Sequence, residues 1–85
     1  MMKPDYRTLV RHLVEPLIGD PHSLRVDIES TAGGKRVRVR LSFDAQDRGR
    51  VFGRGGRTLQ AIRQVMTTAA VLAEQTLRLE IYDPR

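Results

Sequence analysis

The chain has 85 residues, of which 40% are hydrophobic and 5% aromatic, enough for one small domain with a mainly aliphatic core. So few aromatic residues argue against base recognition on exposed aromatic platforms. The absence of cysteine excludes a disulfide framework and a thiolate metal site. Fifteen basic and ten acidic residues give a net charge of +5, which favours a polyanionic partner, although a membrane surface would also satisfy it.

No run of about 18 apolar residues is present, so no segment is predicted to span a membrane. The N-terminus also lacks the apolar region of a secretory signal. A chain without cysteine fits a reducing compartment. We therefore expect a cytoplasmic protein with no membrane attachment and no metal or other cofactor.

After a short lead-in, Met1–Pro4, the first periodic segment predicts a helix with Asp5 as its N-cap. Pro16 should bend or end this helix, because proline lacks an N–H and clashes with the preceding turn. Apolar residues recur at three- and four-residue steps along one stripe: Leu9, Val10, Leu13, Val14, Leu17 and Ile18.

The period then changes to two, which is typical of half-buried strands. Residues 24–29 and 36–43 should form an antiparallel hairpin around the turn Thr31-Ala32-Gly33-Gly34. The alternation places apolar side chains on one face of this hairpin and polar side chains on the other.

The polar face of the second strand carries three arginines, Arg36, Arg38 and Arg40. The favoured interpretation is a solvated face on which they pair with Asp27 and Glu29 of the first strand. The alternative is an extension of a nucleic-acid-binding surface.

The C-terminal half predicts two helices and one strand. Asp44 can cap a short helix over 45–52, with Asp47 in its first turn. A longer helix should follow at about 57–73 and a strand at 76–81, before a short tail, Tyr82–Arg85. The longer helix has one apolar stripe: Leu59, Ile62, Val65, Met66, Ala69, Ala70 and Ala73.

The predicted element order is therefore α-β-β-α-α-β, in a single domain over 1–85 with a structured core at about 5–82. A hairpin followed by a two-helix crossover places the third strand parallel to the second. The fold class is α+β, with a three-stranded mixed sheet covered on one face by three helices.

A glycine-rich turn lies between the last two predicted helices. Gly53, Gly55 and Gly56 allow positive φ and remove the Cβ atoms that would keep a ligand away. The next helix directs its unpaired first-turn N–H groups and positive dipole end toward this turn, which favours an anion such as phosphate. No acid occurs from 48 to 73, whereas five arginines surround the turn: Arg48, Arg50, Arg54, Arg57 and Arg63.

Other glycine motifs fail on spacing. A Walker loop requires a Lys-Ser or Lys-Thr pair, and the chain has none. A dinucleotide fingerprint that starts at Gly53 and Gly55 would require glycine where Thr58 stands. The remaining alternative is a plain helix–turn–helix corner with glycines for packing, which the surrounding arginines and flanking strands make less favoured.

The stretch Val51-Phe52-Gly53-Arg54-Gly55-Gly56-Arg57-Thr58-Leu59-Gln60-Ala61-Ile62 resembles the KH-domain signature V-I-G-x-x-G-x-x-I-x-x-I. Phe52 and Leu59 replace isoleucines of that signature. Nearly the whole chain resembles the small bacterial single-KH proteins of the KhpA (YlqC) family in length and element order. The resemblance implies a type II KH-like domain with strand order 1-2-3.

The resemblance also implies a non-catalytic protein that binds about four nucleotides of single-stranded RNA along a GXXG loop. Its implied biology is that of an RNA chaperone or post-transcriptional regulator, acting with a larger KH protein of the KhpB or Jag type. The backbone-contacting residues would be Gly53, Arg54, Gly55 and Gly56. Arg48, Arg50, Arg57 and Arg63 would add electrostatic attraction. Candidates for apolar groove walls, some of which must serve the core instead, are Val51, Phe52, Leu59 and Ile62.

A second hypothesis is a protein-interaction module that forms a homodimer, or a heterodimer with a KhpB/Jag-type protein. Ala61, Val65 and Leu72 widen the apolar stripe of the long helix beyond the ~100° needed for packing on one side. The two hypotheses are compatible. An enzyme is disfavoured, because His12 and His22 lie on a predicted helix and turn, and no carboxylate accompanies the glycine turn.

Overall fold

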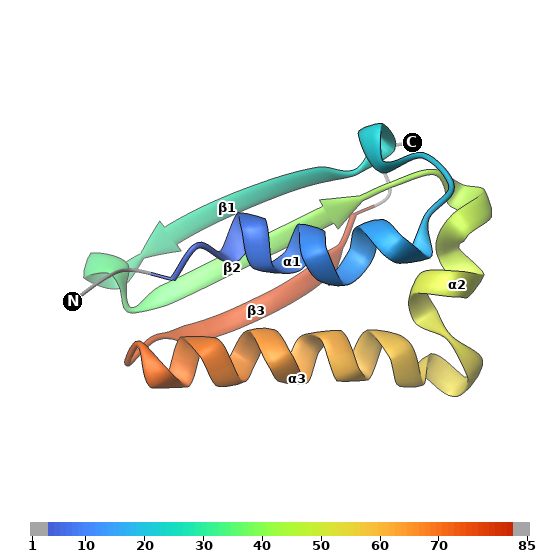
Figure 1. Ribbon diagram of the computed structural model, residues 1–85. Coiled ribbons are helices and arrows are strands. Elements are labelled where there is room, and N and C mark those ends of the chain that lie inside the picture. The colour runs from blue at the N-terminus through green and yellow to red at the C-terminus, as the bar shows by residue number, and fades with distance from the viewer. Residues whose placement is uncertain (1–3, 83–85) are drawn as a thin grey trace.

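The computed structural model describes residues 4–82 (Figure 1); most of the predicted lead-in and tail, residues 1–3 and 83–85, lies outside the described residues. The predicted order α-β-β-α-α-β is confirmed. The helices and strands are α1 (Tyr6–Val14), β1 (Arg25–Thr31), β2 (Arg36–Ser42), α2 (Arg48–Phe52), α3 (Arg57–Leu72) and β3 (Thr76–Ile81).

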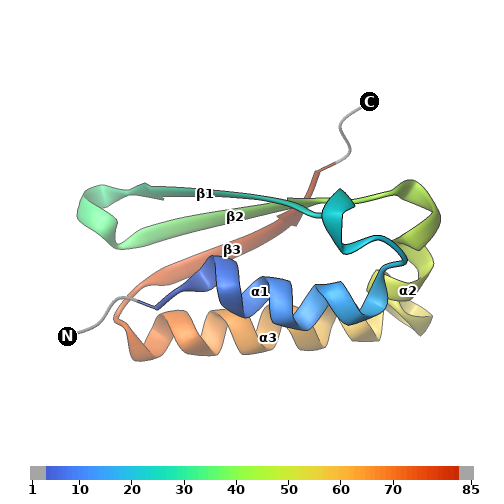
Figure 2. The same cartoon turned by 45° about the horizontal axis from the view of Figure 1, so that its top comes forward.

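The three strands form one mixed sheet in the order β1-β2-β3, as predicted. β1 pairs antiparallel with β2, and β2 pairs parallel with β3. Figure 2 shows the sheet as one layer with α1 and α3 beneath it, so the helices lie on one side of the sheet. The α+β class is confirmed, and the opposite face of the sheet stays open.

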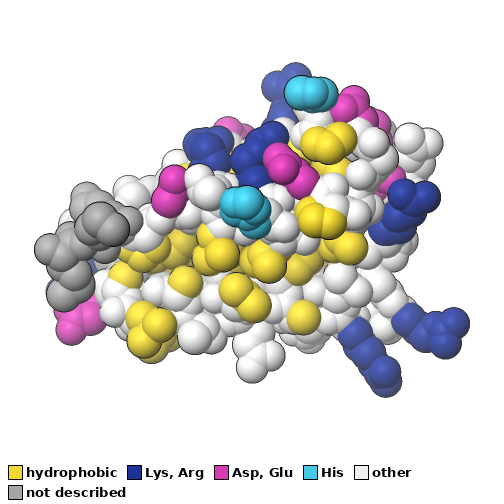
Figure 3. All heavy atoms as spheres, viewed as in Figure 1, with side chains coloured by type: hydrophobic (Ala, Val, Ile, Leu, Met, Phe, Trp, Pro, Cys, Tyr) yellow, Lys and Arg dark blue, Asp and Glu magenta, His cyan; other side chains and the backbone are white. Residues whose placement is uncertain are grey.

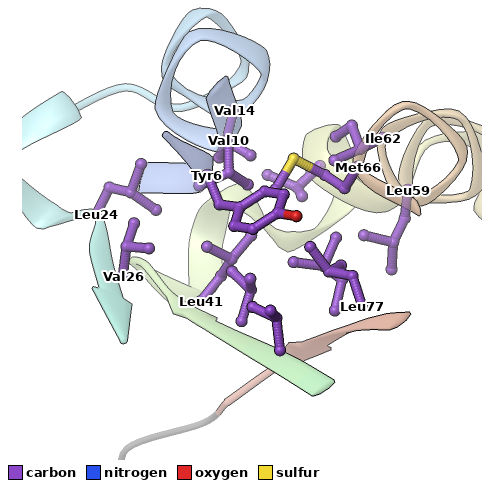
Figure 4. Packing of buried hydrophobic residues seen from close by; sticks show 14 of the residues in the cluster. Tyr6, Val10, Val14, Leu24, Val26, Leu41, Leu59, Ile62, Met66 and Leu77 are labelled. Atoms are coloured by element: carbon purple, nitrogen blue, oxygen red, sulfur yellow. The ribbon is translucent and has the colours of Figure 1, made fainter. Parts of the chain in front are cut away.

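The core lies between the sheet and the helices, where the apolar faces of both meet (Figure 4). Strand alternation sends Val26, Val39 and Leu41 into it, while Arg38 and its neighbours on the other face remain exposed. Burial of each such aliphatic side chain stabilises the fold by roughly 1.5–3 kcal/mol. The six largest fully buried side chains are Leu41, Met66, Val10, Val14, Val39 and Val51.

The predicted N-cap of the first helix and its interruption near Pro16 are confirmed, but the α-helix ends before Leu17 and Ile18 of the predicted stripe. One Asp5 carboxylate oxygen accepts the Thr8 N–H at 3.1 Å, and the other accepts the Thr8 hydroxyl at 2.7 Å. These hydrogen bonds, the side-chain one foremost, lower the pKa of Asp5. The α-helix ends at Val14, and Pro16 lies in the 3₁₀ turn that follows, Glu15–Leu17.

Two local predictions are wrong. Asp44 makes no side-chain cap hydrogen bond, because a 3₁₀ turn, Ala45–Asp47, precedes α2 and separates Asp44 from it. Val65, predicted on the buried stripe of α3, is 43% exposed. The buried stripe is narrower and consists of Leu59, Ile62, Met66 and Ala70, with Ala69 half-buried against the core.

Asp47, expected in the first turn of the short helix, directly precedes α2 and is buried, with only 3% of its surface exposed. Its Oδ2 accepts the Gly19 N–H at 3.3 Å, and its Oδ1 lies 4.0 Å from Arg50 Nη1. Because Gly19 lies beyond α1 and Asp47 directly precedes α2, this carboxylate connects the segment after α1 to the start of α2.

We predict that Asp47→Ala lowers the free energy of unfolding by about 1–2 kcal/mol, since it removes a charged acceptor from the Gly19 N–H. Urea denaturation monitored by circular dichroism would measure the loss. Asp44→Ala is the matched control, because Asp44 is exposed and caps nothing. Equal stability losses in both variants would contradict a connecting role for Asp47.

Candidate nucleic-acid interface

The glycine loop is a tight turn between α2 and α3. Its backbone hydrogen bonds run from Gly53 N–H to the Gly49 carbonyl at 2.9 Å and from Gly56 N–H to the Gly53 carbonyl at 3.1 Å. Gly53, Gly55 and Gly56 have φ values of 73°, 66° and 76°. Since L side chains rarely adopt such values, the turn requires glycine or a residue that tolerates a left-handed backbone.

The glycines at 53 and 55 meet different requirements. A Cβ on Gly53 would lie 2.2 Å from Thr58 Oγ1 and 2.9 Å from the Thr58 backbone nitrogen, so no side chain fits there. A Cβ on Gly55 would meet nothing within 4 Å. Gly53 therefore holds the loop against the start of α3, whereas Gly55 leaves open space at the tip.

The first turn of α3 is available to an anion. Its N-cap is Gly56, which has no side chain to accept a hydrogen bond from the first N–H groups. The dipole of this 16-residue helix adds a partial positive charge at the same end. The helix start and the open tip at Gly55 together present donors to a phosphate.

Four of the five predicted arginines surround this loop with exposed side chains: Arg48, Arg50, Arg54 and Arg57. Within residues 4–82, only Arg50 of these four lies within 4.0 Å of an acid, Asp47. The Arg48 guanidinium lies 5.1 Å from the centre of the Phe52 ring, within cation–π range. Figure 3 shows basic side chains extending from this corner of the molecule.

Arg63, the fifth arginine, is not at the loop. It is half-buried on α3, and its Nε donates to the Leu79 carbonyl of the edge strand β3 at 3.3 Å. It lines a groove between α3 and β3, together with Thr67, Leu77, Arg78, Leu79 and Glu80. Sequence reasoning missed this groove, although the expected strand order 1-2-3 already made β3 an edge strand.

Three of the four candidate groove-wall residues lie in the core. Val51, Leu59 and Ile62 are buried, whereas Phe52 is only half-buried beside the loop. A buried side chain has no surface to offer a ligand. Phe52 is therefore the apolar candidate that a bound nucleotide can reach.

The arginines of β2 are partly paired across the sheet. Arg38 and Arg40 lie 4.0 and 3.9 Å from Glu29, and Arg38 also lies 3.8 Å from Glu80. The predicted partner Asp27 stands opposite Arg40 in register but comes within 4.0 Å of no basic group in the described chain. Arg36 likewise has no acid within that distance among residues 4–82. The predicted pairing across the solvated face is thus confirmed for Glu29 and wrong for Asp27.

In the described part of the chain, no group of three or more His, Asp or Glu side chains is arranged to hold a metal ion. Over the same residues, no helix has the length and hydropathy needed to cross a membrane.

The strand order, the three helices on one face of the sheet and the glycine loop before α3 define a KH-like domain of type II. A family model described as KhpA/KhpB, KH domain matches residues 7–81. The chain belongs to this family, which confirms the resemblance found in the sequence.

Several bacterial proteins named RNA-binding protein KhpA are similar to the chain. The one from Bacillus subtilis is 37% identical over 75 residues, covering 88% of this chain and 90% of its own. The one from Mycobacterium tuberculosis is 36% identical over 74 residues, covering 87% and 86%. The one from Streptococcus pneumoniae serotype 4 is 41% identical over 58 residues, covering 68% and 71%.

A similar solved structure is that of Era in complex with MgGDPNP and nucleotides 1506–1542 of 16S ribosomal RNA. The TM-score is 0.54 at 15% identity, over 93% of this chain and 31% of the Era chain. At that identity the likeness concerns the fold alone.

We predict that Gly53→Ala lowers the free energy of unfolding by about 3 kcal/mol or more, since it adds a clash to a backbone conformation that only glycine adopts readily. Gly55→Ala should cost only about 1 kcal/mol, because its φ is left-handed but its Cβ points into open space. Urea unfolding of both variants measures the difference. Similar losses would show that Thr58 does not constrain the loop.

Proposed function

We propose that this protein is a non-catalytic single-stranded RNA-binding protein that grips the RNA backbone with its glycine loop. The observation that carries the proposal is the uncapped start of α3 beneath an open glycine tip, with exposed arginines around it. The name RNA-binding protein shared by the KhpA relatives supports the choice of RNA as the polyanion.

The loop and the α3–β3 groove suggest a path for the RNA strand. Gly53, Arg54, Gly55 and Gly56 contact the phosphates, and Arg57 stands beside them at the start of α3. From the loop the RNA strand follows the groove, where the terminal guanidinium N–H groups of Arg63 offer donors. Contacts of this kind position a backbone and read little sequence, so affinity is modest and specificity low.

The biological role that fits these properties is that of a cytoplasmic RNA chaperone or post-transcriptional regulator. Weak, unspecific grip on a backbone allows a protein to act on many transcripts. The family model covers both KhpA and KhpB, which supports a KhpB/Jag-type KH protein as a partner.

We predict that Arg54→Asp combined with Gly55→Asp abolishes RNA binding while the fold survives. Two carboxylates at the tip would face the phosphates and reverse the local potential. The left-handed φ of Gly55 adds a cost of about 1 kcal/mol, partly offset by negative charge near the start of α3. Fluorescence anisotropy with a labelled oligoribonucleotide measures binding, and thermal melting by circular dichroism measures stability.

The matched control is Arg54→Asn with Gly55→Asn, which has the same shape and the same tolerance of left-handed backbone but no negative charge. This control should keep part of the affinity.

For wild type, neutralisation of roughly three phosphates gives a slope of log K against log salt of about −2, at ~0.7 per phosphate. Undiminished binding by the folded Asp variant would remove the loop from the RNA site.

A second candidate function, compatible with the first, is self-association through α3. Val65, Val71 and Leu72 are 43%, 70% and 80% exposed, which is unusual for apolar side chains on one helix. Figure 3 shows further hydrophobic side chains along the seam between α1 and α3. Ala61, also exposed, continues the apolar surface toward the loop.

We predict that Val65→Asp yields a folded monomer where wild type forms a dimer, because a charge in an apolar interface is costly. Sedimentation velocity over a range of concentrations measures the association state. Gln64→Asp is the control, since Gln64 is an exposed polar neighbour on the same helix. A wild-type protein that stays monomeric at high concentration would exclude self-association.

A further inference from the structure

The open face of the sheet carries a second group of arginines, on the side away from the helices. Strand register aligns its side chains in rows across the sheet. Nearest the β1–β2 hairpin, Thr31, Arg36 and Thr76 form one row. The next row consists of Glu29, Arg38 and Arg78.

These two rows surround a hollow in the open face. Three arginines stand there against one glutamate, which leaves two positive charges uncompensated within the rows. The side chains of Thr31 and Thr76 are exposed and add hydroxyl donors. The complete lining is Glu29, Thr31, Arg36, Val37, Arg38, Thr76, Leu77 and Arg78.

The neighbouring acids do not saturate these arginines. Arg38 lies 4.0 Å from Glu29 and 3.8 Å from Glu80, and Arg78 lies 3.8 Å from Glu80, all near the limit for an ion pair. Such exposed pairs are weak. Each guanidinium carries five N–H donors, so donors remain for a phosphate even when one carboxylate is nearby.

We propose that this hollow is a second phosphate-binding site, which holds the backbone of a second RNA segment while the glycine loop holds the first. The proposal rests on the proposed function of the loop. The two sites lie on opposite sides of the sheet and toward opposite ends of the molecule, whose longest dimension is 37 Å (Figures 1 and 2). About four nucleotides on the loop therefore leave the hollow free, and one domain brings two segments together.

The lining favours RNA over the other anionic partners. Guanidinium groups and threonine hydroxyls match the oxygens of a phosphate. Stable anchoring to a membrane combines a basic patch with inserted apolar groups, and in the described chain the exposed large apolar side chains, Val65, Val71, Leu72 and Tyr82, lie outside the lining. An acidic peptide would also be attracted by charge, and competition with decaglutamate distinguishes it from RNA.

The test counts pentauridylate molecules bound per chain, by isothermal titration and native mass spectrometry at low salt. Wild type should bind two, and Arg36→Gln with Arg38→Gln should bind one, at the loop. Arg78 is left unchanged because it also lines the α3–β3 groove. On a 30-nucleotide strand, the same variant should flatten the salt slope by about 1.4, for two phosphates at ~0.7 each.

The outcomes separate this proposal from that for the loop. A single pentauridylate on wild type, or two on the arginine variant, overturns the second site and leaves the loop untouched. Conversely, loss of one of two bound molecules in the Arg54→Asp, Gly55→Asp variant supports both sites. If that variant still binds two molecules, the proposal that the loop binds RNA is overturned instead.

Removing the two neighbouring glutamates provides a test in which RNA binding is expected to become tighter instead of weaker. Glu29→Gln with Glu80→Gln should tighten the second binding event, since both carboxylates compete with phosphate for Arg38. Glu15→Gln with Asp20→Asn makes the same charge change on the chain segment after α1 and should leave that event unchanged. Either of two results would overturn RNA as the occupant. One is equal tightening of the second binding event in both double variants, and the other is displacement of the second pentauridylate by decaglutamate at equal charge.

Discussion

The close approach of Gly53 to Thr58 is the contact on which the site depends. It allows the short loop 53–56 to turn directly from α2 into α3, and any Cβ at position 53 would clash with Thr58. As a result the first N–H groups of α3 lie directly under the loop tip. Asp47 fixes the other end of α2, where its carboxylate accepts the Gly19 N–H. The geometry of the candidate site thus depends on helix packing as well as on glycines with positive φ.

α3 serves three roles along its length. Its N-terminus presents donors and arginines, its middle buries Ile62 and Met66 in the core, and its C-terminal half exposes Val71 and Leu72. Because the buried stripe is narrow, the remaining faces are free for a ligand and for a protein partner. RNA binding and association can therefore share one helix without sharing the same residues.

Much of the site was predictable from the sequence because it is local. Positive φ at Gly55, an arginine-rich and acid-free segment, and a helix start after the turn all follow from residues adjacent in the chain. The groove between α3 and β3 was not predicted, because Arg63 and Leu79 are sixteen positions apart and meet only when the sheet forms. The burial of Asp47 was not predicted for the same reason, since its partner Gly19 is 28 positions away.

The sequence by itself determined the element order, the strand topology and the glycine-rich, arginine-rich composition of the loop, since periodicity, turn residues and charge act over a few residues. Only the tertiary structure decided which apolar residues of the motif stay accessible. Val51, Leu59 and Ile62 had the right spacing for a groove wall, yet all three are buried and Phe52 alone remains half-exposed. Periodicity defines which side of a helix is apolar, but the packing of neighbouring elements decides how much of that side they cover.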